Sequence, residues 1–119
     1  MIVDRLDQTV SHVIKESGTW EPHYLRTMAR FVKEGDTVVN IGSHIGLEAI
    51  VLGKIAGPKG KLFILEPFSV SNNMVRKNVF LNQLGSITTI YKKGAGNKYS
   101  KGFISVDTIN TGGSSIFTD

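Results

Sequence analysis

The stretch VVNIGSHIG, residues 38–46, decides the fold of this chain. Its first part is short, β-branched and nearly continuous in apolar character, which is typical of a strand buried on both faces of a parallel sheet. Gly42 allows a sharp turn at the end of that strand and leaves the backbone open to a ligand. Gly46 opens a helix predicted over residues 47–55, whose first N–H groups favour a negative or electron-rich group.

The pattern continues downstream of this helix. Apolar strands are predicted at residues 62–65 and 87–91, and between them a helix begins at Ser69 and is closed by Gly85. This β-α-β-α-β alternation predicts the α/β class, as a partial Rossmann-like parallel sheet with right-handed crossovers.

Further elements are predicted on both sides of this unit. Upstream, helical spacing predicts an amphipathic helix over residues 3–14, and Glu21-Pro22 opens a second helix. Downstream, residues 103–106 and 115–117 are short β-like pieces that predict a tail forming either a hairpin or an excursion at the sheet edge. At 119 residues we expect one domain: N-terminal helices (1–33), a nucleoside-binding unit (37–91) and a tail (92–119).

An acidic residue closes the second predicted strand. Glu66 stands twenty residues after Gly46 and is followed by Pro67. Ligands of open α/β sheets bind at the carboxyl ends of the strands, and an acid at this spacing is what a ribose site requires. We therefore expect Glu66 to accept hydrogen bonds from the ribose hydroxyls of a nucleoside.

Composition narrows the functions further. There is no cysteine, which excludes disulfides and thiolate chemistry and favours an intracellular reducing compartment. The histidines at 12, 23 and 44 lack metal-ligand spacing, so no metal site is expected. No apolar run approaches the ~20 residues of a membrane span, and the acidic N-terminus does not resemble a targeting signal.

The net charge of +4 is concentrated in the second part of the chain. A run without any acid contains four lysines: Lys92, Lys93, Lys98 and Lys101. The run is either a patch for an acidic partner or nucleic acid, or simply a solvated loop; we favour the loop.

Several motifs, in this order, resemble the FkbM-type methyltransferases. They are G-x-W-E-P (18–22), E-G-D-x-V-V-N-I-G-S-H-I-G (34–46), G-P-K-G-K (57–61), E-P (66–67), K-N-V-F-L-N (77–82) and T-G-G-S-S (111–115). The resemblance covers about residues 18–117. It implies the class I Rossmann-like fold that uses S-adenosylmethionine as its cofactor.

The resemblance also implies roles for single residues. The loop under the methionine part of the cofactor corresponds to Gly42, Ser43, His44, Ile45 and Gly46. Glu66 corresponds to the ribose-binding acid, with Pro67 after it. Glu21 either faces the amino-acid end of the cofactor or is simply a helix-start acid. His44 is more simply an exposed loop histidine than a ligand contact, and Asn78 and Asn82 are expected to be helix-surface and C-cap residues.

The chain departs from the family in two respects. Asn40 stands where the family usually has an aspartate that helps to hold the cofactor's ammonium group, so we expect weaker binding. The family also continues into an Asp-x-Glu-Gly segment, which does not occur here. The resemblance therefore implies only the cofactor-binding part of a methyltransferase, with no catalytic residues of its own.

These departures lead to two hypotheses and a structural expectation. The chain is either a methyltransferase component that acts with a partner chain, or a degenerate, non-catalytic subunit of a larger assembly. In either case residues 38–41 form an open, apolar sheet edge, which we expect the tail (102–118) or another protein chain to cover.

Overall fold

The computed structural model describes residues 1–118 and has the predicted α/β architecture. Its central sheet is parallel, in the order β1-β2-β3, and a separate antiparallel hairpin follows it. The elements are α1 (Val10–Ser17), α2 (Pro22–Ala29), β1 (Thr37–Ile41), α3 (Leu47–Ala56), β2 (Lys61–Leu65), α4 (Ser69–Leu81), η1 (Gly85–Ile87), β3 (Thr88–Tyr91), β4 (Gly102–Ser105), η2 (Thr111–Gly113) and β5 (Ser115–Thr118).

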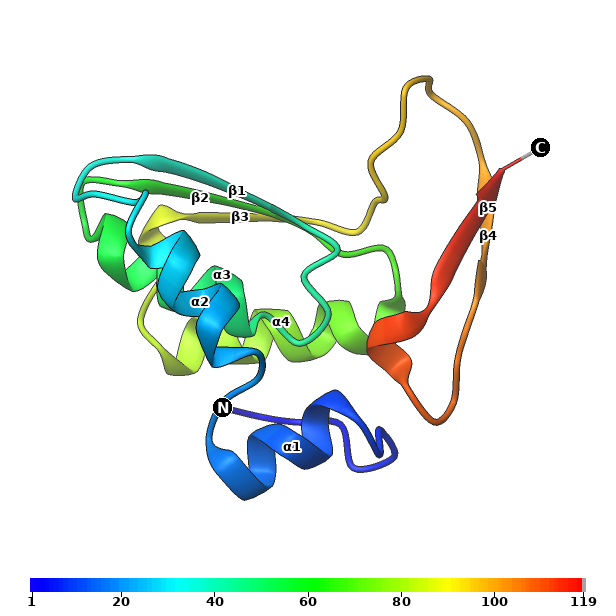
Figure 1. Ribbon diagram of the computed structural model, residues 1–119. Helices are drawn as coiled ribbons and strands as arrows, with labels where there is room; N and C mark the ends of the chain where they lie inside the picture. Colours follow the sequence, from blue (N-terminus) through cyan, green and yellow to red (C-terminus); the bar gives the residue numbers. More distant parts are fainter. Residues whose placement is uncertain (119) are drawn as a thin grey trace.

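The sheet is covered by helices on one side only (Figure 1). The strands add in chain order, β1 pairing with β2 and β2 with β3, so the two crossovers run in the same direction. Right-handed crossovers in one direction place their helices on the same face of a sheet. The helices α3 and α4 accordingly share one face, and α2 packs beside α3.

The hydrophobic core lies between this face and the helices. Leu62 and Ile64 of β2 are fully buried, and Val75 of α4 and Ala49 of α3 are fully buried with them. Val38 of β1 is 8% exposed and joins the same cluster. This core holds β2 in the centre of the sheet. The glycine loop and Glu66 lie at the carboxyl ends of the strands that the core supports.

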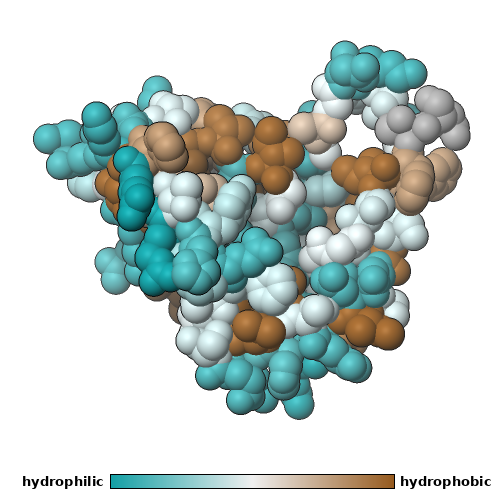
Figure 2. Space-filling view, in the orientation of Figure 1, coloured by the Kyte–Doolittle hydropathy of each residue, from teal (hydrophilic) through white to brown (hydrophobic). Residues whose placement is uncertain are grey.

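The expected burial of β1 on both faces is wrong. Val39 is 56% exposed and Ile41 is 60% exposed, because no helix among residues 1–118 covers the second face of the sheet. Apolar side chains gather over this part of the molecule (Figure 2). Burying them would be favourable by about 25 cal/mol per Å² of apolar surface.

The open edge of β1 is present as expected, but the tail does not pair with it. Within the described residues β1 pairs only with β2, while β4 and β5 pair with each other. Of the two alternatives for the tail, the structure shows the hairpin, which stands apart from the sheet (Figure 1). We expected either the tail or another protein chain to cover this edge. Over residues 1–118, the structure excludes pairing of the tail with β1.

The first helix begins later than its apolar spacing predicts. It starts at Val10 rather than at residue 3, and it ends at Ser17, with Gly18 as its C-cap at a φ of 78°. The carboxylate of Asp7 accepts hydrogen bonds from the main-chain N–H groups of Thr9 (3.1 Å) and Ser11 (2.7 Å). These bonds fix a turn ahead of the helix, as short acidic side chains commonly do.

Asn78 corrects a second expectation, because it is fully buried rather than on the helix surface. Its Nδ2 donates to the carbonyl oxygens of Ile2 (2.8 Å) and Ile45 (2.9 Å), and its Oδ1 accepts from the N–H of Ile2. Asn78 thus ties the N-terminal segment and the glycine loop to α4. Asn82 is the C-cap of α4, as predicted.

Candidate functional site

The loop between β1 and α3 turns through three residues with positive φ: Gly42 (72°), His44 (49°) and Gly46 (90°). The N–H groups of Gly42 and Ser43 donate to the carbonyl oxygen of Leu65, which holds the start of the loop against the end of β2. Left-handed backbone is easy for glycine but uncommon for histidine. The loop geometry therefore explains both glycines and makes His44 the unusual residue.

Glu66 ends β2 and organises this loop. Its Oε2 accepts a hydrogen bond from the N–H of His44 (2.8 Å), and its Oε1 accepts one from the N–H of Phe68 (2.9 Å). The residue is only 6% exposed. Burial raises the pKa of its carboxyl group, and the two hydrogen bonds offset part of that rise. Each carboxylate oxygen still has a second lone pair for a ligand hydroxyl.

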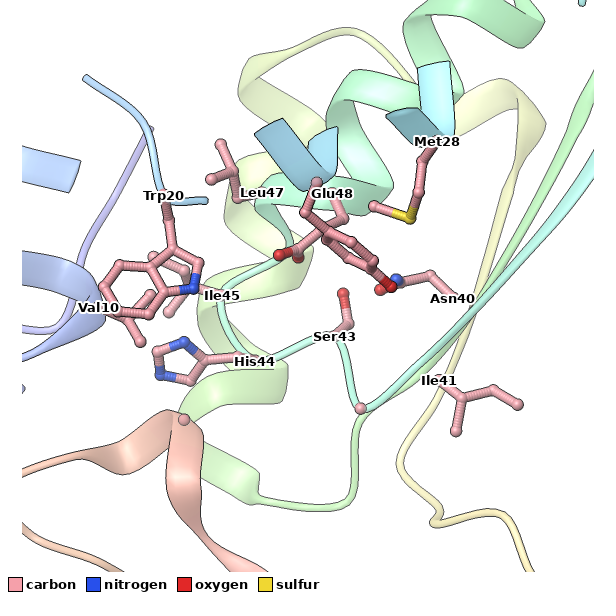
Figure 3. Close-up of a pocket in the computed structure, with 13 residues that line it drawn as sticks. Val10, Trp20, Met28, Asn40, Ile41, Ser43, His44, Ile45, Leu47 and Glu48 are labelled. Atoms are coloured by element: carbon pink, nitrogen blue, oxygen red, sulfur yellow. The ribbon is translucent and has the colours of Figure 1, made fainter. Parts of the chain in front are cut away.

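A cavity of about 230 Å³ lies between the glycine loop, α2 and the start of α3 (Figure 3). Its wall includes Trp20, Tyr24 and Met28. Asn40 Oδ1 and Ser43 Oγ are buried without a hydrogen-bond partner among residues 1–118. Buried polar atoms are nearly always paired, so this cavity is suited to a polar ligand that completes them.

Glu48 contributes a carboxylate to the same cavity (Figure 3), and the sequence reasoning did not select it. Burial raises the pKa of its carboxyl group, and the negative charge of Glu21 raises it further. A carboxylate with a perturbed pKa in a cleft is a candidate functional group. The sequence feature that could have identified Glu48 is its position as an acid in the first turn of the helix after the glycine loop.

A second cavity, of about 190 Å³, lies on the other side of the loop. Glu66, Pro67 and Phe68 form one wall, and residues of the tail form the other. The two cavities have four residues in common: Ile41, Gly42, His44 and Gly112. The glycine loop thus separates two adjoining compartments, and one elongated ligand could extend from one into the other.

His44 is held inside this site rather than exposed, which corrects the expectation of an exposed loop histidine. Its side chain is 13% exposed, its Nε2 lies 2.8 Å from Thr111 Oγ1, and it lies 4.0 Å from Asp7 Oδ2. Burial lowers the pKa of the imidazole, and the nearby Asp7 opposes that effect. His44 therefore connects the glycine loop to the tail, a contact that local sequence does not reveal.

The structure brings most of the residues selected from sequence together at the cavities. Asn40, Ser43 and Ile45 line the first cavity, and Pro67 lines the second. Gly46 starts α3 beside Val75, where an added Cβ would lie 3.6 Å from that side chain. Glu21 is exposed at the start of α2 and does not line either cavity, although its charge acts on Glu48.

Comparisons with known proteins support a methyltransferase-like fold. No protein-family model matches the chain. A protein-L-isoaspartate O-methyltransferase from Methanococcoides burtonii is 29% identical over 91 residues, which covers 75% of this chain and 40% of that protein. The chain therefore spans about two fifths of the length of the curated relative it matches.

Two solved structures are similar in fold. A Clostridium thermocellum protein described as an rRNA methylase superposes with a TM-score of 0.59 and 26% identity, over 61% of this chain and 39% of that one. An S-adenosylmethionine-dependent O-methyltransferase from Thermotoga maritima superposes with a TM-score of 0.58 and 24% identity, over 68% and 32%. The chain thus has the fold of the class I S-adenosylmethionine-dependent methyltransferases.

Two further observations concern metals and membranes. Within residues 1–118, no three histidine, aspartate or glutamate side chains gather in a metal-binding arrangement. Among the same residues, none of the helices has the length and apolar character needed to cross a bilayer.

Proposed function

We propose that this chain binds S-adenosylmethionine across the two cavities, as the cofactor-binding part of an FkbM-type methyltransferase. The observation that carries the proposal is the pair of adjoining cavities around the glycine loop, one closed by Glu66 and the other containing unpartnered polar atoms. The adenosine occupies the second cavity, and its ribose hydroxyls donate to Glu66. The methionine part occupies the first cavity, beside Asn40 and the loop 42–46.

Each selected residue has a role in this proposal. Gly42 and Gly46 keep the loop backbone free of side chains, while Ser43 offers a hydroxyl and Ile45 anchors the loop in the interior. Pro67 borders the adenosine and follows the ribose acid. Glu21 adds negative charge toward the amino-acid end of the cofactor, as its effect on the pKa of Glu48 supports.

The bound cofactor would supply an electrophilic methyl group on its sulfonium. Positioning of a methyl acceptor in line with that group is the main contribution a protein makes to such a transfer. We assign no general base among the described residues. The proposal therefore includes completion of the site by a partner chain that adds a strand at the open edge of β1 and covers Val39 and Ile41.

The alternative function is a non-catalytic structural subunit of a larger assembly. The bare edge of β1 and the amide at Asn40 favour it. Nucleic-acid contact through Lys92, Lys93, Lys98 and Lys101 remains a weaker prediction, supported only by the exposure of these four side chains. It requires that log affinity for RNA fall linearly with log salt concentration.

Contacts between distant segments support treatment of the chain as one domain. The N–H of Gln8 donates to the carbonyl oxygen of Ile109 (2.9 Å), and His44 contacts Thr111. The N-terminal helices, the βαβαβ unit and the tail therefore meet around the glycine loop.

Amide chemical-shift mapping of the full chain with S-adenosylhomocysteine tests the proposal. We expect the largest shifts at residues 40–46, 66–68 and 111–113, which border the two cavities. Shifts that are absent at millimolar ligand, or that cluster elsewhere, would reject cofactor binding and favour the structural alternative.

A further inference from the structure

The first cavity contains a carboxylate that lacks a cationic partner. Glu48 points into it from the first turn of α3 (Figure 3). Among residues 1–118, no lysine, arginine or histidine nitrogen lies within 4.0 Å of this carboxylate. Keeping a partly buried carboxylate charged and unpaired is costly, and that cost falls when a cation binds beside it.

Two further oxygens of this cavity are unpartnered among the described residues and can accept hydrogen bonds. Asn40 Oδ1 can only accept hydrogen bonds, and Ser43 Oγ accepts as well as donates. Ser43 is 1% exposed, and neither oxygen has a hydrogen-bond partner within residues 1–118. Both side chains point toward the same space as Glu48 (Figure 3). The Glu48 carboxylate and these two oxygens together match a ligand group with several N–H donors and one positive charge.

A primary ammonium group has this chemistry, because it carries three N–H donors and a compact charge. We propose that Glu48, together with Asn40 Oδ1 and Ser43 Oγ, binds the α-ammonium group of the ligand's methionine part. The inference rests on the proposed function. Glu48 thereby supplies, from α3, the negative charge that Asn40 does not supply from β1.

The electrostatics of the first cavity agree with this assignment. The pKa of Glu48 is raised by burial and by the negative charge of Glu21. The negative charges of Glu48 and Glu21 interact, and Glu48 has no basic side chain beside it in the described part of the chain. Together the two acids attract a cation more strongly than either acid alone. The exposed Glu21 would add long-range attraction, and Glu48 the direct contact.

Three ligands separate the ammonium from the other parts of the cofactor. S-adenosylmethionine carries both an ammonium and a sulfonium, S-adenosylhomocysteine carries the ammonium alone, and 5′-methylthioadenosine carries neither. Calorimetry of the full chain would measure the dissociation constant of each ligand for the wild type and for Glu48→Gln. Glu16→Gln, an exposed position on α1, is the matched control.

We expect Glu48→Gln to weaken both ammonium-bearing ligands by about 10- to 100-fold, the effect of one charge-assisted hydrogen bond. Binding of 5′-methylthioadenosine should change less than twofold, and Glu16→Gln should leave all three ligands unchanged. Because Glu48 has no cationic protein partner to lose among residues 1–118, the variant should also unfold, without ligand, at a temperature no lower than the wild type.

Each contrary outcome has a separate meaning. Equal losses for all three ligands, or a variant that does not fold, would show that Glu48 supports the structure, and would overturn the inference. A loss confined to S-adenosylmethionine would overturn it by assigning Glu48 to the sulfonium. An unchanged affinity for all three would overturn it while leaving the proposed function intact. Failure of all three ligands to bind the wild type would reject the proposed function itself, and the inference with it.

Discussion

The main-chain N–H of His44 donates a 2.8 Å hydrogen bond to Oε2 of Glu66, which joins the glycine loop to the end of β2. The other carboxylate oxygen accepts from the N–H of Phe68. Glu66 therefore holds two loops in place before any ligand arrives. Its role in the fold must be separated from its proposed role toward ribose.

The first prediction concerns the stability contribution of Glu66. In the absence of ligand, Glu66→Ala should lower the free energy of unfolding by about 1–3 kcal/mol, because two main-chain N–H groups lose their acceptor. Urea denaturation measures this change. Glu34→Ala is the control, since Glu34 is an exposed residue whose contact with Lys59 spans 3.6 Å, and it should shift stability by no more than ~0.5 kcal/mol. Equal midpoints for wild type and Glu66→Ala would contradict this account of the loop.

The second prediction concerns the pH dependence of Glu48. Its pKa is raised above the ordinary value of 4.5, so the folded wild type retains this proton to a higher pH than the unfolded chain does. The wild type therefore loses stability as pH rises through that raised pKa, whereas Glu48→Gln has no such group.

The measurement is the difference in unfolding free energy between Glu48→Gln and the wild type, followed from about pH 4 to about pH 7. The difference should be smallest at the acidic end and grow in favour of the variant as pH rises. A difference that is constant with pH, or that grows in favour of the wild type, would mean that Glu48 is not an uncompensated acid.

The third prediction concerns the contact between His44 and Thr111. A double-mutant cycle with His44→Asn and Thr111→Val should give a coupling energy of about 0.5–1.5 kcal/mol. Asparagine is chosen because it tolerates the positive φ of 49° at this position better than most residues. Thermal or urea unfolding supplies the four stabilities. Strictly additive effects would show that the tail is not fastened to the loop through this pair.

The fourth prediction concerns the bare face and edge of the sheet. Val39 is 56% exposed on a strand with one unpaired edge, and such strands promote association between molecules. Val39→Lys should raise the monomer fraction of the full chain at high concentration in sedimentation experiments. Phe80→Lys, at an apolar position on α4 that is 80% exposed, is a control for added charge away from this face. A wild type that stays monomeric at all concentrations would argue against the partner at this edge.

Local pattern was sufficient for much of the fold. The strand over residues 37–41, the helix after Gly46 and the Glu66 position follow from apolar runs, glycine turns and spacing, which are properties of neighbouring residues. The start of α1 was less predictable, because the apolar spacing from Val3 onward continues through a turn that Asp7 holds by hydrogen bonds.

Contacts between distant residues were beyond such patterns. Asn78 resembles a surface residue in sequence, yet its partner Ile2 is 76 residues away and its partner Ile45 is 33 residues away. His44 likewise contacts Thr111, 67 residues further on. Glu48 resembled an ordinary first-turn acid, since only the packing of α2 against α3 creates the cavity it faces.

Calorimetric titration of this chain with S-adenosylhomocysteine tests the central claim most directly. The account predicts saturable binding of one ligand per chain, with a dissociation constant below about 1 mM, equivalent to about −4.1 kcal/mol. No saturable heat at millimolar ligand, with the chain shown to be folded in the same buffer, would contradict it.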